Sequence, residues 1–391
     1  MRMNRRTFMG ASAAFAGVPL FAGRAFAALK PPANPVVITV ADVAGNLALT
    51  QPALQYYAQS KPEWISRIAF TKAPAPELPA KLKAQQGAGR VDIDLVLTGT
   101  DALAAGLAQN IWQSLAPYRT DLPDLERIFI PQAYKMQEMA NNHGIVVSYY
   151  PSGPLIEYMP NRVPVPPKSA EELLEWSRQN KNKLIYARPS NSGPGRTFLM
   201  GLPYILKDKD PMDPEKGWDK TWAYLQELGK NIEYYPSGTT QTMREFGEGT
   251  RDIVITTTGW DINPRVLGTV PAEARVGTLA GFHWVTDAHY MVVPNGVSPE
   301  KLPVLLDLMA FMLTPKAQAY AYDLGYFYPG PAVKDVPLSL APEESQKAIK
   351  EYGRSEYADW IENNPKDVPL DAERIVVAFR LWDERVGAKK S

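Results

Sequence analysis

The sequence predicts an α/β protein built as two lobes, and three observations lead to this fold class. Short apolar runs alternate with helical patterns between residues 36 and 97, and the alternation returns between residues 184 and 256. A strand–helix–strand order implies a parallel sheet with helices on its faces. The chain has 391 residues, and a chain of this length commonly divides into two or more domains.

The first alternation places three strands and two helices in order. Residues 36–40 read Val-Val-Ile-Thr-Val, and such a β-branched run predicts a buried strand. A helix over 48–60, a strand over 67–71, a helix over 78–86 and a strand over 93–97 follow. These elements predict the sheet of the first lobe.

The second alternation contains strands over 184–187 and 253–256 and an apolar helix over 197–206. Ser169 and Glu172 form a capping-box pattern, which predicts the start of a further helix. These elements predict a second sheet with its own helices.

Two apolar runs, 145–150 and one within 283–293, predict crossovers between the lobes. We therefore expect the first lobe to comprise residues 34–148 plus 290–331. The second lobe would comprise residues 149–289 plus 332–391, including helices near the C-terminus.

The N-terminus predicts an export signal over residues 1–27. Arg5 and Arg6 precede a short apolar stretch, and Ala-Phe-Ala at residues 25–27 forms a cleavage site, which is the order of a signal peptide. The arginine pair followed by Thr-Phe-Met favours twin-arginine export, with general secretion as the alternative. We expect the mature protein in the periplasm.

The composition excludes several classes of function. The chain has no cysteine, which excludes a disulfide framework, a thiolate metal site and a cysteine nucleophile. Lys+Arg and Asp+Glu both number 42, so the basic excess typical of nucleic-acid binding is missing. The three histidines lack metal-type spacing. We expect no metal, no cofactor and no nucleic-acid partner, and no motif of an enzyme is apparent.

Candidate binding residues follow the predicted strands, because ligands of parallel α/β sheets bind beyond the carboxyl ends of the strands. Gly45 and Asn46 follow the first strand, and Thr98 and Thr100 follow the third. Each loop taken alone is also compatible with an ordinary helix cap.

Two Gly/Ser-rich turns, 190–196 and 236–240, precede predicted helices. Unpaired N–H groups at a helix N-terminus favour an anion, and Arg196 suits a carboxylate or phosphonate. The turns contribute four further candidates: Asn191, Ser192, Ser237 and Thr239.

Two tryptophan–acid pairs complete the candidates. Trp260 and Asp261 follow the strand 253–256, while Trp284 and Asp287 precede the apolar run at residue 290. An indole beside a carboxylate holds a cation by cation–π attraction and ion pairing. Core packing, the commoner role of a large aromatic side chain, remains the alternative.

Several of these segments resemble those of extracellular solute-binding proteins, which deliver solutes to ABC importers. The resemblance is carried by residues 41–50, AGRVDIDLVLTGTDALAAG (88–106), YARPSNSGPGRTFL (186–199), YYPSGTTQTMREFGEGTRDIVITTTGW (234–260) and residues 282–326. The group that binds polyamines, iron or thiamine is the most similar. The resemblance implies the type II periplasmic-binding-protein fold, with a hinge between the lobes and the ligand in the cleft.

The resemblance also implies ligand contacts by Gly45, Asn46, Thr98, Thr100, Trp260, Trp284 and Asp287. Polyamine binders place acids in the 190–196 turn, where this chain has Ser190, Asn191, Ser192 and Arg196. The spacing from Trp284 to Asp287 is one residue longer than in that subgroup. Iron binders have a tyrosine pair near 253–260, where this chain has Thr-Thr-Thr-Gly-Trp, which argues against ferric iron.

We therefore predict the periplasmic substrate-binding component of an ABC importer, a monomer that hands its solute to a permease driven by an ATPase. Its ligand would be a small polar solute that carries an amine, with zwitterions included. Two alternatives stay open: an exported enzyme with His283 and Asp287 as acid and base, and a binding protein that serves a chemoreceptor. The predicted site comprises Gly45, Asn46, Thr98, Thr100, Asn191, Ser192, Arg196, Ser237, Thr239, Trp260, Asp261, Trp284 and Asp287.

Overall fold

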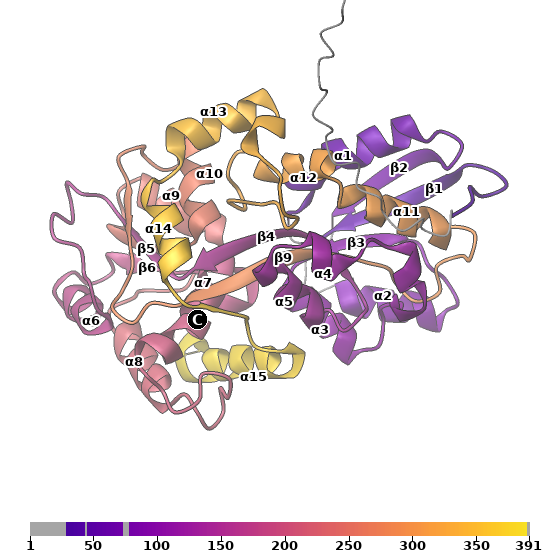
Figure 1. The fold of residues 1–391 in the computed structure, drawn as a ribbon. Helices are drawn as coiled ribbons and strands as arrows, with labels where there is room; N and C mark the ends of the chain where they lie inside the picture. Colours follow the sequence, from indigo (N-terminus) through magenta and orange to yellow (C-terminus); the bar gives the residue numbers. More distant parts are fainter. Residues whose placement is uncertain (1–28, 44, 73–77, 389–391) are drawn as a thin grey trace, which may run out of the picture.

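A computed structural model gives the fold of the chain and describes residues 29–43, 45–72 and 78–388. The predicted signal peptide, residues 1–27, lies outside the described residues. Figure 1 shows two α/β lobes side by side, with strands β4 and β9 running between them. Each lobe has its own sheet, one of six strands and one of four.

The six-stranded sheet belongs to the first lobe and has the order β10–β9–β3–β1–β2, with β4 also paired to β9. β1 pairs in parallel with β2 and β3, whereas β9 runs antiparallel to both β3 and β4. The strands are β1 (Val36–Asp42), β2 (Ile65–Lys72), β3 (Leu95–Thr98), β4 (Ile145–Gly153), β9 (Trp284–Val292) and β10 (Lys366–Asp367). The helices of this lobe are α1 (Leu47–Ser60), α2 (Leu78–Gly87), α3 (Thr100–Ala108), α4 (Leu125–Ile128), α5 (Pro131–Met139), α11 (Leu302–Met312) and α12 (Pro315–Gln318).

The four-stranded sheet belongs to the second lobe and has the order β6–β7–β5–β8. Its strands are β5 (Leu155–Tyr158), β6 (Leu184–Ile185), β7 (Ile253–Thr256) and β8 (Arg275–Gly277). Five helices precede the crossover β9: α6 (Ala170–Gln179), α7 (Gly193–Ile205), α8 (Asp219–Gly229), α9 (Thr239–Gly247) and α10 (Thr258–Val266). Three more, α13 (Glu343–Tyr352), α14 (Glu356–Asn363) and α15 (Ala372–Trp382), come from the C-terminal part of the chain.

Serine side chains cap two helices of the second lobe, α6 and α7. The Ser169 hydroxyl accepts from the Glu172 N–H at 3.2 Å, while a Glu172 carboxylate oxygen accepts from the Lys168 N–H at 2.8 Å, which confirms the predicted capping box. Ser192 accepts from the Gly195 N–H at 3.1 Å, and Pro194 stands in the first turn, where its missing N–H costs nothing. Serine therefore sets where α6 and α7 begin.

The hydrophobic cores follow the two lobes. One core packs around the first sheet and uses residues from 36–149 and 288–336. The main core of the second lobe draws on residues 156–285 and 370–386, together with Ala104 of α3. Ala104 is the point where the lobes share apolar packing, because α15 lies against α3 there. Figure 1 shows α15 running along the lower side of the molecule from α8 toward α3.

Most predicted elements are present, and the differences have local causes. The strands predicted at 36–40, 67–71 and 253–256 and the crossovers at 145–150 and 283–293 are confirmed as β1, β2, β7, β4 and β9. The first sheet is mixed and not purely parallel, because β9 runs antiparallel to its neighbours β3 and β4. The predicted strand 184–187 is paired only over β6.

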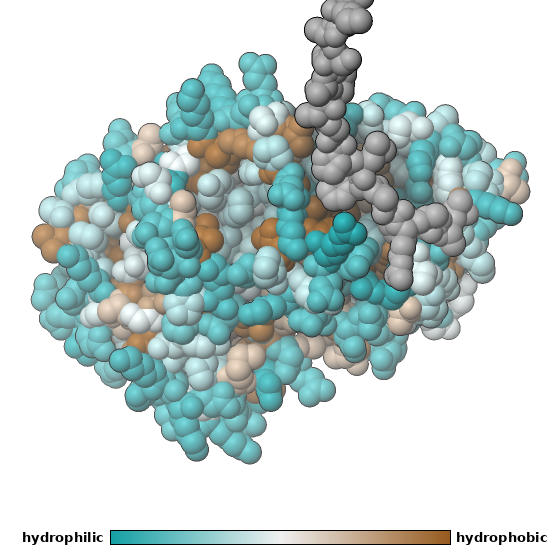
Figure 2. All heavy atoms as spheres, viewed as in Figure 1, coloured by the Kyte–Doolittle hydropathy of each residue, from teal (hydrophilic) through white to brown (hydrophobic). Residues whose placement is uncertain are grey.

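The face of the molecule in view is mostly hydrophilic on its outer sides. Figure 2 shows mostly hydrophilic residues on the outer sides of both lobes and hydrophobic residues between them on the face in view. None of the helices in the described part of the chain combines the length and the apolar character that a membrane span requires.

Candidate functional site

The candidate site centres on the Asp287 carboxylate, at the place where the two lobes meet. Its Oδ1 accepts hydrogen bonds from the Thr100 hydroxyl at 2.8 Å and from the Ala288 N–H at 2.9 Å. Its Oδ2 accepts from the Tyr150 hydroxyl at 3.0 Å and from the Arg196 guanidinium. Four elements therefore converge here: the N-terminus of α3, the crossover strands β4 and β9, and the first turn of α7.

Arg196 connects the lobes directly. Besides Asp287, its guanidinium faces the carboxylate of Asp101 on α3, with 3.5 Å between Nη1 and Oδ2. Only 9% of the Arg196 side chain and 3% of the Asp287 side chain are exposed. Because α3 belongs to the first lobe and α7 to the second, the Arg196–Asp101 pair spans the two lobes.

The pKa values of this cluster favour a charged pair at neutral pH. Burial raises the pKa of Asp287, but Arg196, His289 and the Thr100 hydroxyl more than offset it, so the net shift is downward. Burial lowers the pKa of Arg196, and the carboxylates of Asp287 and Asp101 reverse this to a net increase. Burial and the Asp287 charge raise the pKa of Tyr150 well above its usual value, so its hydroxyl donates.

His289 and Asn46 form a second polar contact between β9 and α1. The His289 Nδ1 lies 2.7 Å from the Asn46 Nδ2, and both side chains are buried. Burial lowers the pKa of His289 to about 4, although Asp287 opposes the shift, so the ring is neutral at pH 7. Asn46 is placed by Asp42, whose carboxylate accepts from the Asn46 N–H at 2.9 Å.

An aromatic wall borders these polar groups. Phe327 contacts the rings of His289 and Tyr150, with centroids 4.0 Å and 4.4 Å away. Tyr326 packs edge-on against Trp260 at 5.4 Å. Gly45 has a φ of +76°, and a Cβ there would lie 3.0 Å from the Tyr326 hydroxyl, so glycine lets this loop approach the wall. Trp260, the other predicted tryptophan, is partly exposed and belongs to this wall through its contact with Tyr326.

The two Gly/Ser-rich turns meet in the second lobe. The Ser192 and Thr239 hydroxyls are 2.7 Å apart and buried, which brings the N-termini of α7 and α9 together. Asn191 and Ser237 belong to the same turns but are exposed at the surface. Thr98 is fully buried, and its hydroxyl donates to the Gly99 carbonyl at 3.2 Å. Of these residues, Ser192 contacts Arg196 directly, because its carbonyl accepts from the Arg196 N–H at 2.8 Å.

Trp284 and Asp261 lie in the interior of the second lobe, and the structure does not bring these two predicted residues to the Asp287 cluster. Trp284 is fully buried, and its indole N–H donates to the Trp360 carbonyl at 2.9 Å. Successive strand residues point to opposite faces, so Trp284 and Asp287, three positions apart, face different ways. The Asp261 carboxylate is fully buried and is occupied by Arg265, Arg354 and Tyr357.

Four residues that contribute to the site were not predicted: Tyr150, His289, Tyr326 and Phe327. Strand periodicity is a signal for His289, because it lies two positions from Asp287 and so on the same face of β9. Strand pairing is the signal for Tyr150, which stands opposite Asp287 in the β4–β9 ladder. The Tyr-Phe-Tyr run after Gly325 marks the aromatic wall.

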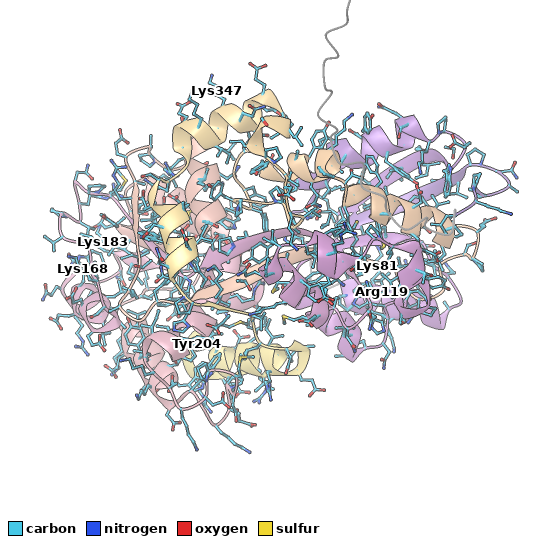
Figure 3. All side chains as sticks on the ribbon, in the orientation of Figure 1. Lys81, Arg119, Lys168, Lys183, Tyr204 and Lys347 are labelled. Carbon is cyan, nitrogen blue, oxygen red and sulfur yellow. The ribbon has the colours of Figure 1, made fainter. Side chains whose placement is uncertain are left out.

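His283 and Asp287 do not form an acid–base pair. The His283 Nδ1 lies 2.7 Å from an Asp367 oxygen, and the ring stacks on Tyr204, labelled in Figure 3, at 4.8 Å. Among the residues that the structure describes, no group of three acids or histidines is arranged to hold a metal ion.

A hollow of about 400 Å³ lies on the second lobe away from this cluster. Figure 3 places Lys183, on its rim, at the outer side of that lobe. Its buried cation, Arg251, is paired with Glu245 at 2.8 Å and faces Glu233 at 3.6 Å. The buried cation of the hollow is thus paired within the protein, and we place the candidate site between the lobes.

The fold and the inter-lobe cluster define a two-lobed binding protein, and comparison with known proteins gives its family. Residues 58–351 match the bacterial extracellular solute-binding proteins. The chain belongs to this family, whose members act outside the cytoplasm, in the periplasm or extracellular space, as substrate-binding components of ABC transporters. No curated protein matches the sequence.

Solved structures agree on the fold at low sequence identity. An ABC transporter protein from Clostridium perfringens superposes with a TM-score of 0.67 and 13% identity, covering 90% of this chain and 100% of that one. A spermidine/putrescine ABC transporter protein from Listeria monocytogenes gives 0.60 and 15%, covering 88% and 99%. A periplasmic thiamin binding protein gives 0.63 and 16%, covering 91% and 97%. The fold is therefore the type II periplasmic-binding-protein fold, and these relatives are transport proteins, not enzymes.

Proposed function

We propose that this protein is a periplasmic receptor that captures a small zwitterion, an amine with a carboxylate or phosphonate, between its lobes. One observation carries the proposal: a buried cation, Arg196, meets two carboxylates, Asp287 and Asp101, at the lobe interface. Opposite charges are therefore presented side by side where the family binds its solute.

The charge arrangement favours a zwitterion over a polyamine. The sequence assigned a cation to Asp287 and an anion to the turn at 190–196, but in the structure Asp287 and Arg196 pair with each other. Removing one partner of a buried pair leaves an uncompensated charge, at a cost of about 3–5 kcal/mol. A zwitterion replaces both partners at once, with its ammonium at the carboxylates and its anion at Arg196. A polyamine has no group to offer Arg196.

The neighbouring groups support the same ligand class. Trp260 and Tyr326 provide aromatic faces for the ammonium end and its carbon chain. Ser192 and Thr239, with the N-termini of α7 and α9, lie on the side of Arg196 and favour the anionic end. We expect the solute to be short, because both ends must be reached from one cluster.

We further propose that the lobes, residues 34–148 plus 290–331 and 149–289 plus 332–391, move about β4 and β9. Binding would shift the population toward a closed form, which docks on the permease and its ATPase. In this proposal the protein is a monomer without a nucleic-acid partner.

A thermal-shift screen of residues 28–391 tests the proposal. The panel holds polyamines, amino acids, aminophosphonates, thiamine and simple anions. A solute at 100 times its Kd adds about 2.7 kcal/mol to the free energy of unfolding. We expect a saturable rise in Tm with amino acids or aminophosphonates. A rise in Tm with polyamines alone would contradict the proposal that the solute is a zwitterion.

Two variants locate the site. Asp287→Asn should abolish the rise in Tm. Trp284→Phe is the matched control, because Trp284 points away from Asp287 on the same strand, so the rise should persist whatever the starting Tm. If Trp284→Phe lost the solute-induced rise in Tm and Asp287→Asn retained it, the site would lie elsewhere.

A further inference from the structure

The Asp261 carboxylate is the centre of a buried network that joins α10 to the C-terminal part of the chain. Arg354 donates to its Oδ1 at 2.6 Å and its Oδ2 at 3.1 Å, and the Tyr357 hydroxyl donates to Oδ2 at 2.6 Å. Arg265 adds two bonds of 3.1 Å from within α10. Burial and Asp261 raise the pKa of Tyr357 well above its usual value, so its hydroxyl keeps the proton that it donates.

The network continues into backbone on both sides. Arg354 also donates to the Ala274 carbonyl at 2.7 Å, just before β8. Arg265 donates to the Tyr352 carbonyl at 2.7 Å, at the end of α13. The first turn of α10 is therefore tied to the sheet of the second lobe and to the C-terminal segment at once.

The same turn also borders the aromatic wall of the candidate site. Successive residues of an α-helix are about 100° apart, so Trp260 and Asp261 project in different directions. Trp260 packs on Tyr326, and Thr258 donates to the Tyr328 carbonyl at 2.8 Å. Gly259 packs so closely that a Cβ would meet the Tyr326 carbonyl oxygen. The first turn of α10 is therefore in contact with residues 326–328 and with Arg354 and Tyr357 at the same time.

Arg354 and Tyr357 lie beyond the part of the chain that matches the family, which ends at residue 351. The C-terminal segment is nevertheless integrated, because both side chains are buried and bonded to α10. Family membership by itself therefore does not assign these residues a role.

We propose that Arg354 and Tyr357 are positioning residues for solute binding. They hold Asp261, Asp261 fixes the first turn of α10, and this turn sets the position of the Trp260 indole in the aromatic wall. The inference rests on the proposed function, because it assumes that Trp260 faces the solute.

The test uses 19F NMR of the solute-free chain labelled with 5-fluorotryptophan. The chain has nine tryptophans, and Trp260→Phe identifies the resonance of Trp260. We expect Arg354→Gln to shift that resonance by at least its linewidth or to split it. Arg354→Lys, which keeps the charge, should restore part of the original position. A Trp260 resonance unchanged in folded Arg354→Gln would overturn the inference.

Arg251→Gln is the matched control, because Arg251 is also a buried arginine of the second lobe but pairs with Glu245 and Glu233, neither of which belongs to α10. Its substitution should leave the Trp260 resonance in place. If Arg354→Gln fails to fold, Tyr357→Phe removes a single hydroxyl and should move the resonance in a smaller step. No movement in Tyr357→Phe would then reject the proposal.

The outcome is separable from that of the proposed function. A shift of the Trp260 resonance without any solute that raises the Tm would reject the function and keep the positioning role. Solute binding that is lost in Trp260→Ala but unchanged in Arg354→Gln, together with an unmoved resonance, would reject the positioning role and keep the function.

Discussion

Two buried arginine–aspartate clusters of this protein have similar chemistry and different attachments. Arg354 and Asp261 both belong to the second lobe, so their contact persists whatever the lobes do. Arg196 stands on the second lobe and faces Asp101 on the first, so lobe separation pulls this contact apart. We call the cluster of Arg354 and Asp261 the permanent tie, and the contact of Arg196 with Asp101 the separable contact.

The difference extends to how well each carboxylate is satisfied. The Asp261 side chain is fully buried and accepts from three side chains. In the lobe contact, Asp101 is 20% exposed and lies 3.5 Å from Arg196. A separable contact needs water to reach its charges when it opens, and a permanent tie does not.

The largest effect is expected where the permanent tie is cut. Asp261→Asn leaves Arg265 and Arg354 buried with one charge too few, and we expect the free energy of unfolding to fall by about 3–5 kcal/mol. Urea denaturation measures it. Glu384→Gln, which removes an exposed pair with Arg380, is the control and should change the value by at most about 1 kcal/mol. If Asp261→Asn and Glu384→Gln lowered the free energy of unfolding equally, the Asp261 cluster would not act as a permanent tie.

A smaller effect is expected at the separable contact. Arg196→Gln leaves Asp287 without its cation, but opening of the lobes lets water reach the carboxylate, so we expect a loss of about 1–3 kcal/mol in urea denaturation. Solute binding should be lost in the same variant. Arg188→Gln, whose partner Asp383 is half exposed, should keep solute binding. A loss as large as that of Asp261→Asn would mean that the lobes do not separate.

The pH dependence sharpens the comparison at His289, which lies beside the separable contact. Its pKa is about 4 in the folded protein, against about 6.5 for a histidine in the unfolded chain. Between these values the unfolded chain binds a proton that the folded protein does not. His289 therefore contributes full stability above pH 6.5, which is lost as the pH falls toward 4, at up to about 1.4 kcal/mol per pH unit.

Urea denaturation at pH 7, 6 and 5 measures this slope. His289→Gln should flatten it, and His143→Gln, which replaces a histidine in the turn after α5, should keep it. An unchanged slope in His289→Gln would show that the histidine titrates alike in both states.

The smallest effect concerns Asp101. Asp101→Asn weakens only the pair that spans the lobes, and we expect a stability change within about 1 kcal/mol but a larger mean lobe separation. Because the chain has no cysteine, dyes can be attached through Lys81→Cys and Lys168→Cys, at exposed positions on opposite lobes (Figure 3), for single-molecule energy transfer. Asp92→Asn, in an exposed pair within the first lobe, should leave the separation unchanged. A larger lobe separation in Asp92→Asn, with no change in Asp101→Asn, would contradict the role of Asp101.

The fold was predictable where a local pattern carries it. The β-branched run of β1 and the apolar run of β7 predict buried strands. Ser169 together with Glu172 predicts the start of α6. The antiparallel entry of β9 into the first sheet was not predictable, because it depends on where the chain returns after more than a hundred residues. The short pairing of β6 likewise depends on its neighbour β7.

The site was predictable in part. Thr100, Arg196 and Asp287 were singled out from residue type and position, and the structure brings them together. That Arg196 and Asp287 pair with each other was not foreseen, because they come from different elements 91 positions apart. The structure does not bring Trp284 and Asp261 to the Asp287 cluster, because the strand and the helix direct their side chains elsewhere, and adjacency in sequence does not give this direction.

The contact of α15 with Ala104 has a consequence for cold conditions. It joins the lobes by removing apolar surface from water, and this driving force weakens on cooling. The ion pair of Arg196 lacks that dependence. A chilled, solute-free molecule is therefore expected to spend more of its time open, so that solute enters faster and is retained less firmly than in warmth.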